Sequence, residues 1–390
     1  MEKISSYLNT EQSLLVDLVT SAIYGKEYNK TGRTTAENAD WDYLIRFSTF
    51  HGLNPILFKA INSLESDVVP SEKLYILDNY NRSNTMRSGL LFDRLWDAVN
   101  LLRSNGIEPL TFKGSVMASE LYGDKASREY SDIDILVHPG SLRKAMELIS
   151  SSGYNPEIDL PDSYRGVYEK YGYYYSHFAE RDNTSLDLHW RLLPSYFSFS
   201  PDTEYVMNHS RQVTVDGRSF PTIKPELMIV YLAIHGAKHS WVQLNWVLDL
   251  ALMAGKDGID WDDVIRISEI YNCRRMLYAG LLLACSVFGP GIPEDITSRA
   301  GSDPDAVRLS EDALSILFPQ KTGFRHRMDI QLYFYSTMES NSDRVKFFHD
   351  TVLKPTMLEW ESVKLPPLLY FLYYLVRPLR LGMKYALGKS

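Results

Sequence analysis

The sequence predicts an α+β fold in which short strands and helices are flanked on both sides by helical segments. Two observations support this prediction. Before residue 105 and again from residue 225 onward, apolar residues recur every three or four positions, as on the buried face of a helix. Between these segments, short β-branched and aromatic runs are separated by glycine, proline and asparagine, as in strands and turns. The predicted parts are a helical region at 1–105, an α+β core at 106–222, a helical domain at 223–361 and a basic, apolar tail at 362–390.

Helical spacing is clearest in three runs of the N-terminal region. The third of these runs ends at Asn105-Gly106, a typical end of a helix. After Pro225 the helical period returns and continues through the C-terminal domain, without an internal repeat or a low-complexity linker. The runs begin at Leu14, at Trp41 and at Leu90.

The predicted core alternates strands with short helices. Its elements, in order, are an extended stretch at 109–112, a helix at 116–122, a strand at 132–138, a helix at 141–151, a hairpin of 168–179 with 185–191, and a second pair of 212–215 with 219–221. The turns are Arg181-Asp182-Asn183 and Asp216-Gly217, which are typical of hairpins.

Composition excludes several classes of protein. The 390 residues include 41 basic and 49 acidic ones, a net charge of −8 that argues against a protein that coats nucleic acid. Two cysteines, Cys273 and Cys285, cannot build a disulfide scaffold or a cysteine-rich zinc site. The N-terminus lacks a basic segment followed by an apolar one, so we expect a cytoplasmic location. From Ser362 onward the tail has five basic residues and no acidic one.

Three aspartates of the core form the pattern that points to chemistry. Asp132 and Asp134 are two apart on a strand, so both side chains project to one face. Carboxylates this close repel each other unless a cation lies between them, and such oxygen ligands suit Mg²⁺. If the strand that carries Asp187 lies beside the first, three carboxylates can hold two metal ions for phosphoryl chemistry.

The segment before the first aspartate favours phosphate binding. Gly114 allows a tight turn, and Ser115 places a hydroxyl at the start of a helix, whose free amide groups attract anions. Lys113 and Arg128 can pair with the charges of a triphosphate.

Together these motifs resemble the DNA polymerase β-like nucleotidyltransferase superfamily and, more narrowly, the uncharacterised nucleotidyltransferase family of bacteria. The resemblance covers residues 85–260 and includes the segment His235-Gly236-Ala237-Lys238-His239 with Trp246 and Asp249. It rests on Lys113-Gly114-Ser115, Arg128, Asp132-Ile133-Asp134 and Asp187-Leu188-His189-Trp190.

The resemblance implies a small mixed β-sheet that transfers a nucleoside monophosphate from an NTP to an acceptor, with Mg²⁺ or Mn²⁺ bound and pyrophosphate released. Gly114 and Ser115 would then contact the phosphates, Asp132 and Asp134 would ligate both metals, and Asp187 would hold the catalytic metal. Sixteen residues separate Ser115 from Asp132, more than is usual in the superfamily. This spacing predicts a longer helix or an extra loop between them.

Other residues have two interpretations each. His189 shares the strand face of Asp187, where it either contacts the acceptor or a phosphate, or is bonded structurally. His235 and His239 have the spacing of a helical metal pair, but Gly236 replaces the glutamate of a zinc hydrolase. Packed histidines, or residues that face the nucleotide cleft, are the alternatives. The tyrosines at 171–175 form either a stacking surface or an ordinary half-buried strand.

The sequence does not specify the acceptor: a small molecule, a carbohydrate and a protein side chain are the alternatives. The acidic composition argues against a long nucleic acid. The alternative function is a catalytically degenerate protein that binds nucleotides or a partner. Because a basic amphipathic end can lie on an anionic membrane surface, the tail adds the hypothesis of a peripheral membrane protein in surface-polysaccharide assembly.

Overall fold

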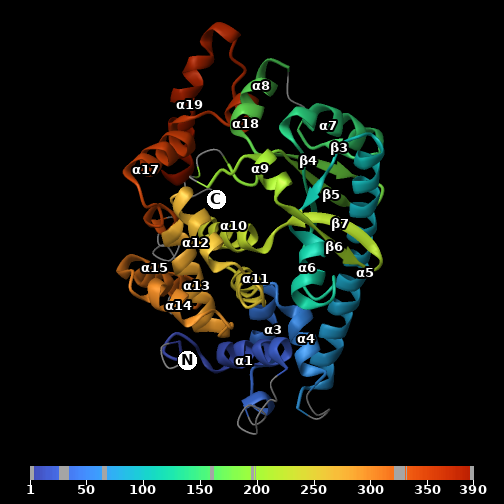
Figure 1. Cartoon of the computed structure of the whole chain (residues 1–390), viewed down its shortest axis with the longest axis vertical. Coiled ribbons are helices and arrows are strands. Elements are labelled where there is room, and N and C mark those ends of the chain that lie inside the picture. The colour runs from blue at the N-terminus through green and yellow to red at the C-terminus, as the bar shows by residue number, and fades with distance from the viewer. Residues whose placement is uncertain are drawn as a thin grey trace.

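The structure is a computed structural model that describes residues 4–25, 35–63, 68–158, 162–194, 197, 199–319, 330 and 332–386. Residues 1–3 of the N-terminal region and 387–390 of the tail lie outside this range. A single sheet stands between the long helix α5 (Ser71–Ser104) on one side and the C-terminal helices on the other (Figure 1). The α+β fold class predicted from the sequence is confirmed.

In the described residues of the N-terminal region, α1, α3 and α5 coincide with the three runs that the periodicity predicts, and α4 is an additional helix. At the start of α1, the Asn9 side chain accepts a hydrogen bond from the Gln12 amide at 2.8 Å, and the Gln12 side chain bonds back to Asn9. The second half of α5 packs on the sheet through Leu91, Leu95 and Val99, which are buried and four residues apart. The helices are α1 (Thr10–Tyr24), α3 (Trp41–Phe50), α4 (Asn54–Ile61) and α5.

The sheet is mixed and its seven strands have the order β3-β4-β5-β2-β1-β7-β6. β2 pairs in parallel with β5, and β1 pairs in parallel with β7, while the other neighbours are antiparallel. The strands are β1 (Leu110–Thr111), β2 (Asp132–Leu136), β3 (Asn155–Pro156), β4 (Tyr174–Ala179), β5 (Thr184–His189), β6 (Ser210–Val215) and β7 (Arg218–Ile223). The helices between them are α6 (Gly114–Tyr122), the 3₁₀ turn η1 (Pro139–Ser141), α7 (Leu142–Ser151), α8 (Asp162–Tyr171) and α9 (Thr203–Asn208).

Each face of the sheet borders a different hydrophobic core. On one face, Ile133, Ile135 and Leu188 are buried against α5 and α7. On the other face, Phe112 and Leu136 belong to the core of the C-terminal helices. Because side chains alternate along a strand, Asp132 and Asp134 share the face of Leu136. These aspartates therefore lie on the sheet face that packs against the C-terminal helices.

The two predicted hairpins are present, with one correction. Asp216 and Gly217 have φ of 47° and 74°, the left-handed conformation of a tight hairpin turn. In the other hairpin, β4 begins only at Tyr174, so the prediction of a strand from residue 168 is wrong. Residues 168–171 end α8, because tyrosine and valine at 164, 167, 168 and 171 follow the spacing of one helix face.

The C-terminal helices pack on the sheet face that carries Phe112. The first of them, α10, is buried along nearly its whole length, and its Tyr231 ring contacts Phe112, the residue that follows β1. The helices are α10 (Pro225–Lys238), α11 (Leu244–Ala254), α12 (Trp261–Ile270), α13 (Arg274–Phe288), α14 (Glu294–Gly301) and α15 (Pro304–Leu317).

The tail folds into short helices that are joined by an internal ion cluster. Glu359 is fully buried, and its carboxylate accepts hydrogen bonds from Arg377 and Arg380. Two of the five basic residues of the tail thus point inward, and contact of the tail with a membrane stays a prediction. Among the described residues, no helix is long and apolar enough to cross a membrane. Before the tail come α17 (Asn341–Phe348), the π-helical turn η2 (His349–Leu353) and α18 (Met357–Ser362), and the tail itself forms η3 (Pro367–Leu372) and α19 (Tyr373–Ala386).

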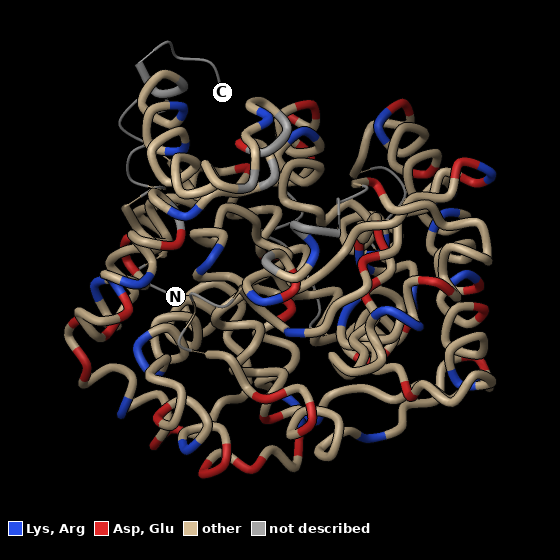
Figure 2. The backbone as a smooth tube through the Cα atoms, turned by 90° about the horizontal axis from the view of Figure 1, so that it is seen from above, with Lys and Arg blue, Asp and Glu red and all other residues tan. Residues whose placement is uncertain are grey.

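Charge is mixed over the outline of the molecule. Figure 2 shows lysine and arginine interspersed with aspartate and glutamate along the helices at the periphery.

Candidate functional site

Strand pairing brings the predicted acids together. β2 and β5 are parallel neighbours in a register that places Asp134 directly opposite Asp187 and Leu136 opposite His189. Since side chains alternate along a strand, Asp132, Asp134, Asp187 and His189 all lie on one face. Along the chain, η1, α7, β3, α8 and β4 separate the two strands, so only the sheet order makes them adjacent.

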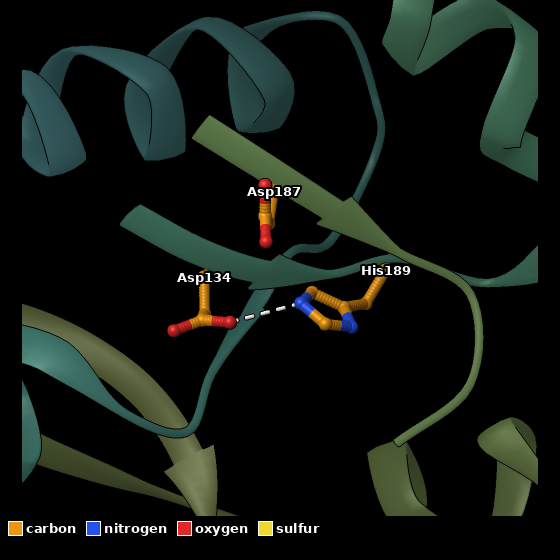
Figure 3. A group of neighbouring side chains, drawn as sticks. All are labelled: Asp134, Asp187 and His189. Atoms are coloured by element: carbon orange, nitrogen blue, oxygen red, sulfur yellow. Dashed lines mark hydrogen bonds and ion pairs between the residues drawn. The ribbon is translucent and has the colours of Figure 1, made fainter. Parts of the chain in front are cut away.

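Asp134 is the centre of this group. Its Oδ1 lies 2.9 Å from His189 Nε2 and 3.3 Å from Lys113 Nζ, and its side chain is 4% exposed. Ligand atoms of Asp134, Asp187 and His189 lie within 4.8 Å of one another, near enough to share one metal ion (Figure 3). The Nδ1 atom of His189 is buried without a hydrogen-bond partner among the described residues.

The electrostatics of these acids fit a bound cation. Burial alone would raise the pKa of Asp134, but Lys113 and His189 outweigh it and hold this pKa below its usual range. Burial and the negative charge of Asp134 raise the pKa of Asp187 to about 7. Burial and Asp134 also raise the pKa of Asp132. The group therefore holds more negative charge than Lys113 can balance, and a divalent cation would supply the difference.

The predicted metal ligands are not all equivalent. Asp132 lies half-buried at the start of β2 and is not among the three residues whose ligand atoms converge. His189, which the sequence places on the same face as Asp187 without a definite role, takes part in this group. Tyr174 stacks on the His189 ring at 5.2 Å between centroids, with 22° between the planes, and so helps to fix the ring orientation.

The predicted phosphate-binding turn lies beside the acids. Gly114 opens α6 with φ of +58°, a conformation that favours glycine, and an added Cβ would be 3.8 Å from the Asp132 carbonyl oxygen. The N-terminus of α6 therefore lies next to the start of β2, with the buried Ser115 in its first turn. Free amide groups at this position favour an anion, so the turn and the acids can serve the same phosphorylated ligand.

Lys113 joins this turn to the acids. Burial lowers the pKa of Lys113, but Asp134, Tyr231 and Asp132 outweigh that effect and hold it above its usual value. The ammonium therefore stays charged and acts as a fixed counter-ion of Asp134.

Arg128 is engaged elsewhere. Its guanidinium makes a bidentate pair with Asp249 of α11, with Nε 2.9 Å from both carboxylate oxygens, and Tyr122 donates to the same carboxylate at 2.7 Å. The residues after α6 form the extra loop that the long Ser115–Asp132 spacing predicts, and this pair ties that loop to the helical domain. A single acid in the apolar run 244–254 is the sequence signal of such a buried partner.

α10 lies beside the acid face, where its Tyr231 ring contacts Phe112 and Lys113. The rings of His189 and Tyr231 each lie edge-on to Phe112, at 5.1 and 5.6 Å between centroids. Further along α10, the rings of His235 and His239 are 4.8 Å apart, and His239 lies 5.0 Å from Trp246. These ring contacts fit packed histidines and histidines that face a nucleotide alike, so both alternatives to a helical metal pair stay predictions.

Comparison with known proteins places most of this region in one family. A family model described as "Uncharacterised nucleotidyltransferase" matches residues 37–289, more than half of the chain. No curated protein matches the sequence. Among solved structures, the solution structure of antibiotic-resistance factor ANT(2'')-Ia is similar, with 14% identity, a TM-score of 0.35, and coverage of 51% of this chain and 96% of that chain.

Proposed function

Because the chain belongs to the uncharacterised nucleotidyltransferase family, we propose that it uses Mg²⁺ or Mn²⁺ to transfer a nucleoside monophosphate from an NTP to an acceptor hydroxyl, with release of pyrophosphate. The observation that carries this proposal is the parallel pairing of Asp134 with Asp187 beside the turn at Gly114. Carboxylates on one side of a ligand and helix amides on the other match the two ends of a metal–triphosphate complex.

The residues fit a resident divalent cation. Asp134, Asp187 and His189 would hold it, with Asp132 available at the start of the same strand. When bound, such ions offset the carboxylate charge, polarise the α-phosphate and stabilise the leaving pyrophosphate. Carboxylate oxygens suit Mg²⁺, and the imidazole adds a ligand that Mn²⁺ accepts readily.

The proposed chemistry assigns a separate task to each residue. Lys113 and the N-terminus of α6 would hold the phosphates. Asp187 would accept the proton of the acceptor hydroxyl, whose oxygen forms a bond to the α-phosphorus as the bond from that phosphorus to the bridging oxygen of the β-phosphate breaks. The products are an acceptor that carries a nucleoside monophosphate and free pyrophosphate.

A thermal-shift screen of the four NTPs with Mg²⁺ or Mn²⁺ tests the proposal. We expect at least one NTP to raise Tm in a metal-dependent manner, because a ligand that binds only the folded state stabilises it. Asp134→Ala and Asp132→Ala should lose this shift and keep the fold. Asp262→Asn, a change of an exposed acid on α12, is the matched control. If none of the four NTPs changes the Tm of the wild-type protein in the presence of Mg²⁺ or Mn²⁺, the proposal is contradicted.

Transfer itself requires a second assay. Incubation with labelled NTP and lysate should label an acceptor and release pyrophosphate, both dependent on Asp187. Metal-dependent binding without pyrophosphate release from any acceptor would instead favour the catalytically degenerate alternative.

A further inference from the structure

Lys238, at the end of α10, is a half-buried cation without an acidic partner. Its Nζ lies 3.3 Å from the Tyr173 hydroxyl and 5.1 Å from the centroid of the same ring. Among the described residues, no carboxylate lies within ion-pair distance of this Nζ. Burial, with a smaller effect of Lys113, lowers the pKa of Lys238 to about 8. Lys113 and Arg128, in contrast, have carboxylate partners in Asp134 and Asp249.

Two imidazoles at the same end of α10 have unused nitrogens: His235 lies one turn before Lys238, and His239 follows it directly. His235 and His239 make no side-chain hydrogen bond within the described part of the chain, and both side chains are half-buried. Burial, followed by the charge of Lys238, lowers the pKa of His239 to about 4. Burial and nearby cations also lower the pKa of His235. Both rings are therefore neutral at pH 7, and each can donate one N–H to an anion.

The position of Lys238 relative to the acids distinguishes it from the phosphate turn. Tyr173 immediately precedes β4, and its ring lies 5.9 Å from that of His189. Lys238 therefore lies near the His189 end of β5, where Tyr174 of β4 pairs with His189. The turn at Gly114 follows β1, on the other side of β2. An NTP whose phosphates lie at that turn leaves the Lys238 side to the second substrate.

We propose that Lys238, assisted by His235 and His239, binds an anionic group of the acceptor, so that the acceptor is a small molecule that carries a phosphate or a carboxylate. This inference rests on the proposed function. A half-buried ammonium without a counter-ion is costly, and an acidic ligand would supply the missing charge. The neutral imidazoles would add directed hydrogen bonds without a further charge to desolvate. The chemistry excludes an uncharged carbohydrate as the group that docks here.

Calorimetric titration with inorganic phosphate tests this subsite. The protein is first saturated with Mg²⁺ and a non-hydrolysable analogue of the NTP found in the thermal-shift screen. We expect Lys238→Met to weaken phosphate binding at least tenfold, Lys238→Arg to restore it to within about threefold, and the affinity for the analogue to change less than twofold in both. Lys59→Met, at an exposed lysine on α4, is the matched control.

Two results would overturn the inference. One is a loss of at least tenfold in affinity for the NTP analogue in Lys238→Met, with phosphate competing against the analogue, because the lysine would then serve the nucleotide. The other is wild-type protein that fails to bind phosphate at millimolar concentration. Retained binding of the analogue shows that the variants are folded. If no NTP binds at all, the proposed function fails, whereas titration of the nucleotide-free protein with phosphate still tests Lys238.

Discussion

Asp134 on β2 and Glu359 on α18 are both buried carboxylates with two nitrogen-bearing partners, yet their surroundings differ. Glu359 is bound by Arg377 and Arg380 and also accepts hydrogen bonds from Thr356, so its cluster has at least as much positive as negative charge. Asp134 has Lys113 and His189, but Asp132 and Asp187 lie on the same face.

The difference separates a structural ion cluster from a site. Arginines that surround a carboxylate satisfy it permanently, and nothing further needs to bind. Three acids with one lysine repel one another, and folding alone does not relieve the repulsion. An excess of charge that the fold retains indicates a ligand of opposite sign. Lys238 is likewise a charge that the fold leaves unbalanced, but this charge is positive.

The largest effect is expected for NTP binding when Asp134 is substituted. Asp134→Asn should weaken metal-dependent NTP binding at least about 100-fold, or about 2.8 kcal/mol, because it removes the central carboxylate of the group. Calorimetry with Mg²⁺ or Mn²⁺ measures this. Glu359→Gln is the control and should keep NTP affinity within twofold. A variant at Asp134 that binds the NTP as tightly as wild type would contradict the assignment.

The second effect is a loss of local stability that should be confined to the cluster of Glu359, Arg377 and Arg380. Glu359→Gln leaves Arg377 and Arg380 close together without a counter-charge, so we expect a loss of about 2 kcal/mol in local stability. Hydrogen exchange over residues 357–386 should rise, while exchange in β2 and β5 stays unchanged. Equal protection of the tail in both proteins would show that the cluster contributes little.

The third effect is a dependence of stability on pH in the metal-free protein. The Asp187 carboxyl has a folded pKa of about 7 against an ordinary 3.8, so the folded state keeps a proton that the unfolded state loses between these values. Stability from this group is therefore present at pH 4 and is lost as the pH rises toward 7. We expect Asp187→Asn in EDTA to gain about 1–2 kcal/mol over wild type between pH 5 and pH 8. Parallel denaturation curves across that range would refute the prediction.

The smallest effect tests how Asp187 is held. Ser176 pairs with Asp187 across β4 and β5, and its hydroxyl hydrogen-bonds to the carboxylate, which lowers the pKa of Asp187. Ser176→Ala should therefore weaken Mn²⁺ binding a few-fold, about 1 kcal/mol, and move its pH dependence upward. Ser176→Thr keeps the hydroxyl and should restore both. A pH profile that does not move would make Ser176 a packing residue only.

Much of the site can be predicted from short sequence segments, because the conformation of each segment depends on neighbouring residues. The alternation of Asp132 and Asp134, the turn at Gly114 and the strand around Asp187 each depend on a few neighbouring residues. Periodicity also predicts the helical flanks. The strand propensity of tyrosine misleads at residues 168–171, where the spacing of tyrosine and valine is that of one helix face.

The partners that complete the site are contributed by the tertiary structure. Asp249 as the partner of Arg128, Ser176 as the partner of Asp187 and Lys238 over Tyr173 all join residues from different elements. The sequence by itself determined which residue types the chemistry uses and the strand face on which they lie, because side-chain alternation is a property of each strand. Only the sheet order and the docking of α10 and α11 decided which charges are balanced and which await a ligand, because charge balance depends on distances between segments remote in the chain.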